Sequence, residues 1–323
     1  MRSFAVWFNG NKINDIPMAD IHVNLIESKR KGKWNIDFGI KIYNIEDVDN
    51  IFLFCPFIIN KIDEIKDLAT ILDTKLLKAL FNENLQVTDG YAKRKYVSIL
   101  PKNDEKFIVY EIDVNREITI KGINDNNEHG TIITIDIKDI KKSVREQEEI
   151  KDINTYYFRF RIGIPYSGSS LVNNEIDGLS VASCTITKTE IIDFRLNNIR
   201  SLGDCVQDEI NKGKKFVLKS VHLLILKKAK DLLMYPSDHP NTRMLEADLW
   251  QNYFSLGNTA DVNDLVAYHF KEKKTDEKEV NEFNILVRFS TMEITWKAIV
   301  LFISFAVILN ILCSVAFEYF RQL

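Results

Sequence analysis

A run of twenty uncharged, mostly apolar residues from Ala298 to Phe317 is the feature that most constrains this chain. An α-helix rises about 1.5 Å per residue, so this run would span roughly 30 Å, the thickness of a bilayer's hydrocarbon core. Trp296 and Lys297 precede the run, and Glu318 and Arg321 follow it. Aromatic and charged residues at both ends are typical of a segment that crosses a membrane.

We predict a transmembrane helix over 296–318 and a short tail over 319–323; a buried core helix is the alternative. At about 100° per residue, the polar residues in and near this helix share an arc of about 140°. They are Glu293, Lys297, Ser304, Asn310, Ser314, Glu318 and Arg321. A lone helix surrounded by lipid gains nothing from such a polar stripe.

The polar stripe predicts that several copies of the helix associate. Asn310 would lie within the hydrocarbon, where a side-chain amide is costly unless it meets another helix or a water-filled lumen. We therefore expect Ser304, Asn310, Ser314 and Glu318 to line a pore or a helix interface in a homo-oligomer. The alternative is that these side chains bond to their own backbone.

The rest of the chain has an ordinary globular composition. Of 323 residues, 28% are charged and 46% hydrophobic, enough for one large or two medium domains. The net charge of −3 argues against a generally basic nucleic-acid binder, but not against a local basic site. The four cysteines have no metal-site or disulfide spacing, which fits a reducing compartment.

The N-terminal residues lack the apolar core, about 7–15 residues long, of a signal peptide. Arg288 and Lys297 precede the predicted span, and Arg321 follows it. We therefore expect a single-pass protein of the inner (plasma) membrane with its N-terminal body in the cytoplasm.

Period-2 alternation dominates the body and predicts strands with one buried and one solvated face. It is clearest in 35–42, 117–121, 132–138, 156–164 and 283–289. Further predicted strands are 2–9, 20–28, 51–59, 93–100, 106–113, 185–196, 216–227 and 264–272. The predicted fold class is α+β and strand-dominated, with antiparallel or sandwich-like sheets and a single C-terminal transmembrane helix.

Helices are fewer in the body. Apolar residues at helical spacing predict helix over 62–83, in one or two pieces. Short helices are predicted over 204–211 and 243–254, and the charge-rich segment 138–151 is predicted as a solvated helix or a connector.

We place a domain boundary near residue 150. It divides a strand-rich domain over 1–150, with the helical insertion at 62–83, from a second strand-rich domain over 151–292. Only Thr291–Ile294 then separates the last strand from the transmembrane helix. Because this link contains no Gly, Pro or Ser run, we predict a short, stiff connection that would transmit rearrangements of the body.

The sequence contains no recognisable catalytic or metal-binding constellation. The loop over 165–170 lacks the glycine pattern of a nucleophile elbow and the Gly-Lys-Ser/Thr of a P-loop. No histidine pair has a zinc-like spacing; the histidines are His22, His129, His222, His239 and His269. We therefore expect no enzyme activity, no catalytic residues, no cofactor and no metal.

Basic and aromatic residues are the better binding candidates. The predicted strand 156–164 places Tyr157, Arg159 and Arg161 on one face. Two arginines in register beside an aromatic ring suit a phosphate and a stacked base, so we predict a ligand site for a nucleotide or short nucleic acid here. A solvated sheet face with cross-strand ion pairs is the alternative. Two basic clusters, over 29–34 and 93–96, are weaker candidates for lipid headgroups or an anionic ligand.

The layout of the span Ala298–Phe317, with its polar stripe, after a strand-rich body resembles membrane effectors of bacterial anti-phage systems. Those proteins join a cytosolic sensing domain to a transmembrane segment that oligomerises and breaches the inner membrane. The resemblance implies a body that senses a ligand or partner and gates a pore of bundled helices. The alternative is a tail-anchored adapter that recruits a protein partner; a membrane-tethered hydrolase would need a catalytic constellation that the sequence does not reveal.

Overall fold

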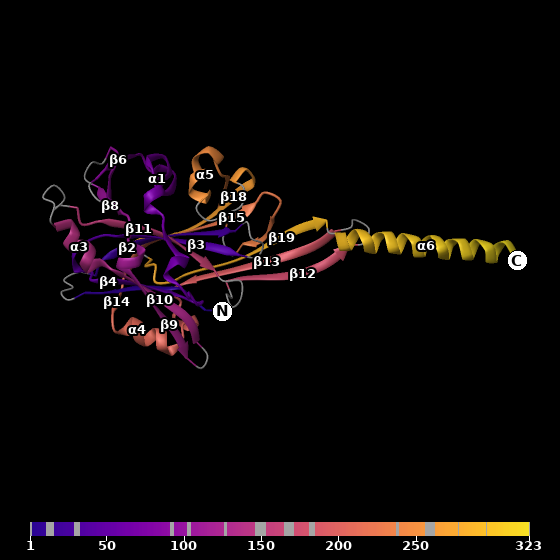
Figure 1. Ribbon diagram of the computed structural model, residues 1–323, viewed down its shortest axis with the longest axis horizontal. Helices are drawn as coiled ribbons and strands as arrows, with labels where there is room; N and C mark the ends of the chain where they lie inside the picture. Colours follow the sequence, from indigo (N-terminus) through magenta and orange to yellow (C-terminus); the bar gives the residue numbers. More distant parts are fainter. Residues whose placement is uncertain are drawn as a thin grey trace. The chain divides into compact units, whose positions relative to one another are not determined.

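The computed structural model describes residues 2–10, 16–28, 33–90, 94–101, 105–125, 128–145, 153–164, 171–180, 185–236, 239–255, 262–276, 278–294 and 296–322. Strands dominate these residues, with mainly antiparallel pairing and one long C-terminal helix, as the predicted fold class requires (Figure 1). The chain divides into two compact units. The large unit is Met1–Leu171, Phe194–Lys228 and Asp238–Ile285; the small unit is Val172–Asp193, Ala229–Ser237 and Leu286–Leu323. The boundary near residue 150 stays a prediction.

A ten-stranded sheet is the centre of the large unit. In spatial order it contains β17 (Asn241–Met244), β18 (Leu265–Lys273), β15 (Val217–Lys228), β2 (Met18–Glu27), β3 (Trp34–Ile42), β11 (Tyr156–Ile164), β8 (Lys106–Tyr110), β7 (Arg94–Ile99) and β6 (Leu85–Asp89), with β5 (Ile65–Asp67) paired to β11. The β15–β2 and β11–β8 pairs are parallel, and the others are antiparallel. The sheet therefore joins strands from distant parts of the sequence.

A five-stranded sheet forms a second layer of the large unit. Its order is β14 (Lys214–Lys215), β1 (Ala5–Asn9), β4 (Asn50–Cys55), β10 (Glu128–Asp136) and β9 (Ile118–Asp125). Helix α4 (Asp204–Asn211), which has the predicted bounds, buries Val206 and Ile210 against Trp7 and Phe54 of this sheet. The 3.6-residue period of α4 supplies the apolar face that the packing needs.

The predicted helix over 62–83 is wrong in its first half. Residues 62–71 form two 3₁₀ turns with β5 between them, and α1 begins only at Thr74 and ends at Phe81. Asp73 explains the start of α1, because its carboxylate accepts a hydrogen bond from the Leu76 backbone N–H at 2.8 Å and caps the helix.

The remaining predicted helices are present with shifted bounds. They are α5 (Ala247–Ser255) and α3 (Ile137–Arg145), and a short helix α2 (Val114–Glu117) was not predicted. Residues 146–151 of the predicted segment 138–151 lie outside the described residues.

The small unit contains a four-stranded sheet and the C-terminal helix. The strand order is β12 (Val172–Ser180), β13 (Thr185–Leu196), β19 (Phe283–Ile294) and β16 (Leu232–Pro236), and the helix is α6 (Trp296–Gln322). The predicted link Thr291–Ile294 is wrong, because these residues belong to β19. Thr291 donates a hydrogen bond to Asp231 at 2.7 Å, and Glu293 pairs with Lys188. A single residue, at position 295, separates strand from helix.

The central strands of the ten-stranded sheet are buried on both faces. Phe38 and Phe160 are fully buried on one face, where Phe38 packs on Phe4 with ring centroids 5.3 Å apart. On the other face α1 and α5 lie side by side (Figure 1) and bury charged residues of β3 and β11. The predicted solvated face is therefore wrong for these strands, because two helices cover it.

Candidate functional site

The register of the ten-stranded sheet aligns polar residues in a row across five strands. Arg159 of β11 lies opposite Gly39 of β3, which lies opposite His22 of β2. His22 is paired with His222 of β15, and His222 with Lys271 of β18. Because paired residues point to the same face, this row gathers side chains separated by up to roughly 250 positions in the sequence.

A buried ion pair occupies the neighbouring row. Arg161 donates two hydrogen bonds to the carboxylate of Asp37, at 2.7 and 2.9 Å. The Tyr253 hydroxyl of α5 donates to the same carboxylate at 2.7 Å. Burial, together with the neighbouring Asp37 charge, raises the pKa of Tyr253. This two-point geometry is the strong form of an Arg–carboxylate contact, and it fixes α5 on the sheet.

Arg159 is bound entirely by protein groups. Its Nε donates to the Tyr253 hydroxyl at 2.7 Å and its Nη1 to the Tyr157 hydroxyl at 2.8 Å. Its Nη2 lies 2.7 Å from the side-chain oxygen of Asn24 when that amide is oriented to accept. Gly39 leaves the space for this arrangement, since a Cβ there would lie 2.2 Å from the Tyr157 hydroxyl and 2.8 Å from Arg159 Nη1.

The structure thus brings Tyr157, Arg159 and Arg161 together, as the sequence predicted, but buries them. Their exposed fractions are 0%, 0% and 2%. The alternative of a solvated face is wrong for this part of the sheet. Direct ligand contact by these residues stays a prediction, and the contacts above give them a structural role beneath the surface.

A cavity of about 500 Å³ opens above the histidine end of the row. We call it the histidine pocket. It is lined by His22, Asn24, Ala79, Leu80, Phe81, Asn82, Glu83, His222, Leu224, Asn241, Thr242, Arg243, Trp250, Ala267, His269, Lys271 and Lys273. These residues come from β2, β15, β17 and β18, from α5 and from the C-terminal end of α1 with the residues that follow it, all in the large unit.

Three histidines form the floor of the pocket. His222 Nδ1 and His269 Nε2 are 3.1 Å apart, so one nitrogen donates and the other accepts. Burial, followed by the nearby lysines, lowers the pKa of His222 to about 3; burial, Lys271 and Arg243 lower that of His269 to about 4. Burial also holds the pKa of His22 well below its usual value. At neutral pH all three are therefore uncharged, and each ring can donate one hydrogen bond.

Positive charge comes from the rim. Lys271 and Lys273 are exposed on one face of β18. Arg243 of the adjacent strand β17 is paired with Ala267, which lies on the same face of β18 as the two lysines, so Arg243 also lies on that face. Partial desolvation of its amine and the neighbouring Lys273 charge lower the pKa of Lys271, although its side chain is largely exposed. Among the described residues Glu83 is the one carboxylate in the lining. The pocket is therefore electropositive although the whole chain carries a net charge of −3.

The end of α1 shapes the wall of the pocket. Asn82 ends the helix with φ 52°, a left-handed conformation that Asn tolerates better than most residues. The Phe81 ring packs on His22 and on Tyr157, with centroids 5.2 and 5.0 Å away. Tyr157 is also bonded to Arg159, so the pocket floor and the buried arginine layer are in direct contact.

No role for these histidines is predicted from the sequence alone. His22 lies on the polar face of the alternating strand β2, whereas His222 shares its face of β15 with Leu224 and Leu226, so alternation does not single out all three. Strand order and the parallel β2–β15 pairing decide their proximity, and neither can be derived from spacing. Among the described residues no three His, Cys, Asp or Glu side chains are placed to share a metal ion.

The polar stripe of α6 is part of a helix that can cross a membrane. Within Ile299–Arg321 it is long and apolar enough to do so, and no part of it is buried in the protein. Ser304 and Ser314 donate their hydroxyl hydrogens to the carbonyls of Val300 and Asn310, both at 2.9 Å. The described residues offer the Asn310 side-chain amide no hydrogen-bond partner, and Glu318 is exposed at the helix end.

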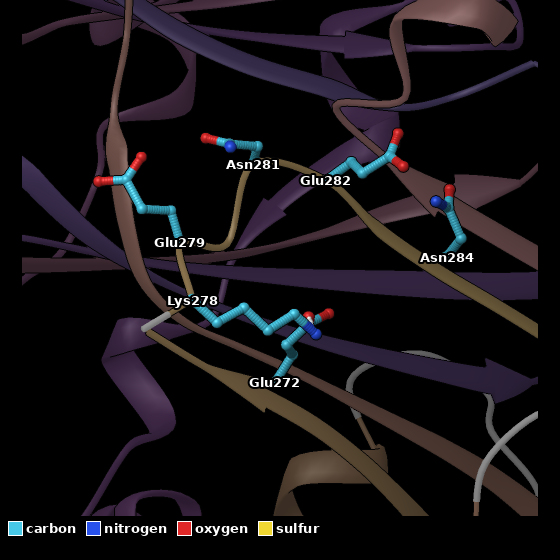
Figure 2. Close-up of a pocket in the computed structure, with 6 residues that line it drawn as sticks. All are labelled: Glu272, Lys278, Glu279, Asn281, Glu282 and Asn284. Atoms are coloured by element: carbon cyan, nitrogen blue, oxygen red, sulfur yellow. Dashed lines mark ion pairs between the residues drawn. The ribbon is translucent and has the colours of Figure 1, made fainter. Parts of the chain in front are cut away.

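A second hollow, of about 470 Å³, lies around Glu272, Lys278 and the residues that follow them. Figure 2 shows the Lys278 amine meeting Glu272, with which it forms an ion pair of 2.6 Å. The carboxylates of Glu279 and Glu282 point in different directions. Because its charges do not converge on one point, this hollow is solvated surface.

The remaining predicted candidates are outside the described residues or engaged. The loop 165–170, Lys29–Gly32 and Lys93 are outside them. Lys95 donates to three carbonyls, of Ala69, Thr70 and Leu72, at 2.7–3.0 Å and so caps a 3₁₀ turn. No protein-family model matches this chain, and no curated protein is significantly similar to it in sequence.

Proposed function

We propose that this protein is an oligomeric membrane effector whose strand-rich cytoplasmic body senses a ligand and gates a pore of bundled α6 helices in the inner membrane. The observation that carries the proposal is α6 itself. It is an apolar helix with none of its span buried, it bears a one-sided polar stripe, and one residue separates it from β19. Such a short junction favours coupling between sheet and helix.

Two further observations support the proposal. The histidine pocket gives the body a built cavity of ligand size. The small unit also exposes Leu232, Met234 and Met292, large apolar side chains with exposed fractions of 57–65%. Exposed apolar groups of this size favour contact between copies of the chain. A role in anti-phage defence rests on the resemblance in layout alone.

Leakage of a small dye from cells tests the pore. We expect leakage with the full chain, clearly less with Asn310→Leu, and none with a chain that ends at Ile294, where β19 ends. Leu309→Ile, on the lipid side of the helix, is the matched control and should leak like the unaltered chain. Equal leakage from the full chain and Asn310→Leu would remove the basis of the pore.

A tail-anchored adapter is the second candidate, and one observation favours it. The hydroxyls of Ser304 and Ser314 are satisfied within their own helix, so they need no neighbouring helix. Replacing Ile299–Phe317 with a plain Leu-rich span separates the two ideas. An adapter would keep its membrane location and its partner after the exchange, whereas a pore would lose leakage. The mass of the detergent-solubilised complex reports whether copies associate.

A further inference from the structure

The rim of the histidine pocket holds cations that the protein does not neutralise. Lys271, Lys273 and Arg243 have no carboxylate within 4.0 Å among the described residues. Lys271 and Lys273 are two positions apart on one strand, so their ammonium groups repel each other. An anion with several oxygens would relieve this repulsion, and the planar guanidinium of Arg243 suits two oxygens of a phosphate group.

The buried layer beneath the pocket adds to this positive potential. Arg159, Arg161 and Lys41 are buried cations of the sheet face, against the buried carboxylates Asp37 and Asp20. Asp20 is bound by hydroxyl groups, and Asp37 is bound by Arg161. Within this buried set the cations outnumber the carboxylates by one, and low polarity extends the reach of their charge.

The wall of the pocket offers an aromatic face and amide groups. Phe81 is half-buried and lines the cavity, and Asn82 and Asn241 contribute exposed amides that can both donate and accept. Trp250 also lines the cavity, is 1% exposed, and has an indole N–H for which the described residues supply no hydrogen-bond acceptor. A buried indole N–H normally has a partner, so this orphan donor points to an acceptor that a ligand would supply.

We propose that the histidine pocket binds a nucleotide, with its phosphate at Lys271, Lys273 and Arg243 and its base against Phe81 and Trp250. The volume of about 500 Å³ suits a ligand of this size. His22 and the one histidine of the His222–His269 pair that accepts within the pair donate N–H groups to the sugar or phosphate, and the rim lysines supply the charge. The inference deepens the proposed function, since it names the class of ligand that the body senses.

Tryptophan fluorescence of the full chain in detergent tests the proposal. The probes are AMP and ATP, with adenosine, inorganic phosphate and a single-stranded RNA of about ten nucleotides as comparison arms. We expect saturable binding of a nucleotide that is at least tenfold tighter than that of adenosine or phosphate alone. Of the four tryptophans only Trp250 lines the pocket. Trp250→Phe should therefore abolish the signal without unfolding the protein.

Charge variants give the second arm. Lys271→Met with Lys273→Met should weaken nucleotide binding at least tenfold, whereas Lys215→Met, an exposed lysine of β14, should leave it unchanged. Circular dichroism verifies that each variant is folded. In the unaltered protein, raising NaCl from about 50 mM to about 500 mM should also weaken binding, which needs no variant.

Three results would overturn the proposal. The first is that neither AMP nor ATP shows saturable binding. The second is that the double-lysine variant and Lys215→Met bind the nucleotide with equal affinity. The third is that inorganic phosphate or the RNA binds as tightly as the nucleotide. Dye leakage is a separate readout. Nucleotide binding without dye leakage would support the pocket assignment and contradict the pore. Dye leakage without nucleotide binding would support the pore and contradict the pocket assignment.

Discussion

At the scale of single residues, the Asp37 carboxylate balances the charge of the buried arginine layer. It accepts hydrogen bonds from Arg161 and Tyr253, and Arg159 reaches it through Tyr253. Asp37→Asn would leave two buried guanidinium groups without a counter-charge, so we expect a loss of about 3–5 kcal/mol in the free energy of unfolding. Tyr253→Phe removes hydrogen bonds but no charge and should cost about 1–3 kcal/mol. Denaturant titration compares the two, and an equal loss would contradict this account.

Gly39 is a second residue whose identity the packing dictates. A methyl group there would collide with Tyr157 and Arg159, which are buried and cannot withdraw. We expect Gly39→Ala to reduce the free energy of unfolding by about 1–3 kcal/mol. Gly163→Ala on β11 is the matched control, because nothing lies within 4 Å of the added atom. Thermal unfolding measures the melting temperatures of both variants. Similar melting temperatures would show that the buried arginine layer can accommodate a methyl group at position 39.

The three pocket histidines make stability depend on pH. Their folded pKa values are lowered, to about 3 for His222 and about 4 for His269, whereas an unfolded histidine titrates near 6.5. Below pH ~6.5 these histidines therefore bind protons in the unfolded chain but stay unprotonated in the folded chain. Their contribution to stability is full above pH ~6.5 and is lost as pH falls toward 4. Arg243, Lys271 and Lys273 face the same rings and oppose their protonation.

The measurement is the melting temperature at pH 7.5 and at pH 5. We expect a loss on the order of 1 kcal/mol for each histidine at pH 5, allowing for partial exposure. His222→Gln with His269→Gln should shrink the loss. An undiminished pH dependence in that variant would assign the effect to other groups.

At the scale of elements, alternation in the sequence predicted most of the long strands, although β12, β16, β17 and β6 were not predicted. Strand β13 has the predicted bounds, and so does α4. The failure over 62–83 has a local cause, because Ile65 and Leu68 have helical spacing but Ile65 pairs with Ile162 of β11. Three residues of edge strand are too short to leave a period in the sequence.

Alternation could not predict which polar faces are solvated. Arg159 and Arg161 alternate with phenylalanines in the way that surface residues do, but α1 and α5 cover them. Burial of charge is tolerated here because each guanidinium has fixed partners. Those partners lie on β3 and α5, about 120 and 90 positions away in sequence.

The junction of β19 and α6 yields a prediction at this scale. One residue inserted next to position 295 would turn the polar stripe of α6 by about 100° relative to β19. Seven inserted residues would return it to within about 20°. If the pore requires a fixed orientation, dye leakage should fall with one inserted alanine and recover in part with seven residues of helix-forming sequence. Equal leakage from both insertions would indicate a free joint.

At the scale of the whole molecule, the sequence predicted the long apolar helix that can cross a membrane, but not the pocket. A membrane span is a local property of about 20 consecutive residues, so composition reveals it. The pocket needs the order of strands β2, β15 and β18, which depends on packing along the entire chain. The predicted anion site on the arginine strand stays a prediction; the cavity opens on the same sheet face but at the neighbouring strands.

The parallel pairing of β2 with β15 has a consequence for how the protein matures. His22 and His222 meet only when segments two hundred positions apart align. Closing so long a loop costs entropy before any contact compensates it, so this step is slow compared with the formation of hairpins such as β6–β7. A nascent or truncated chain that lacks β15 cannot form the pocket at all. The complete pocket is therefore acquired late in folding, and only by chains whose central sheet is complete.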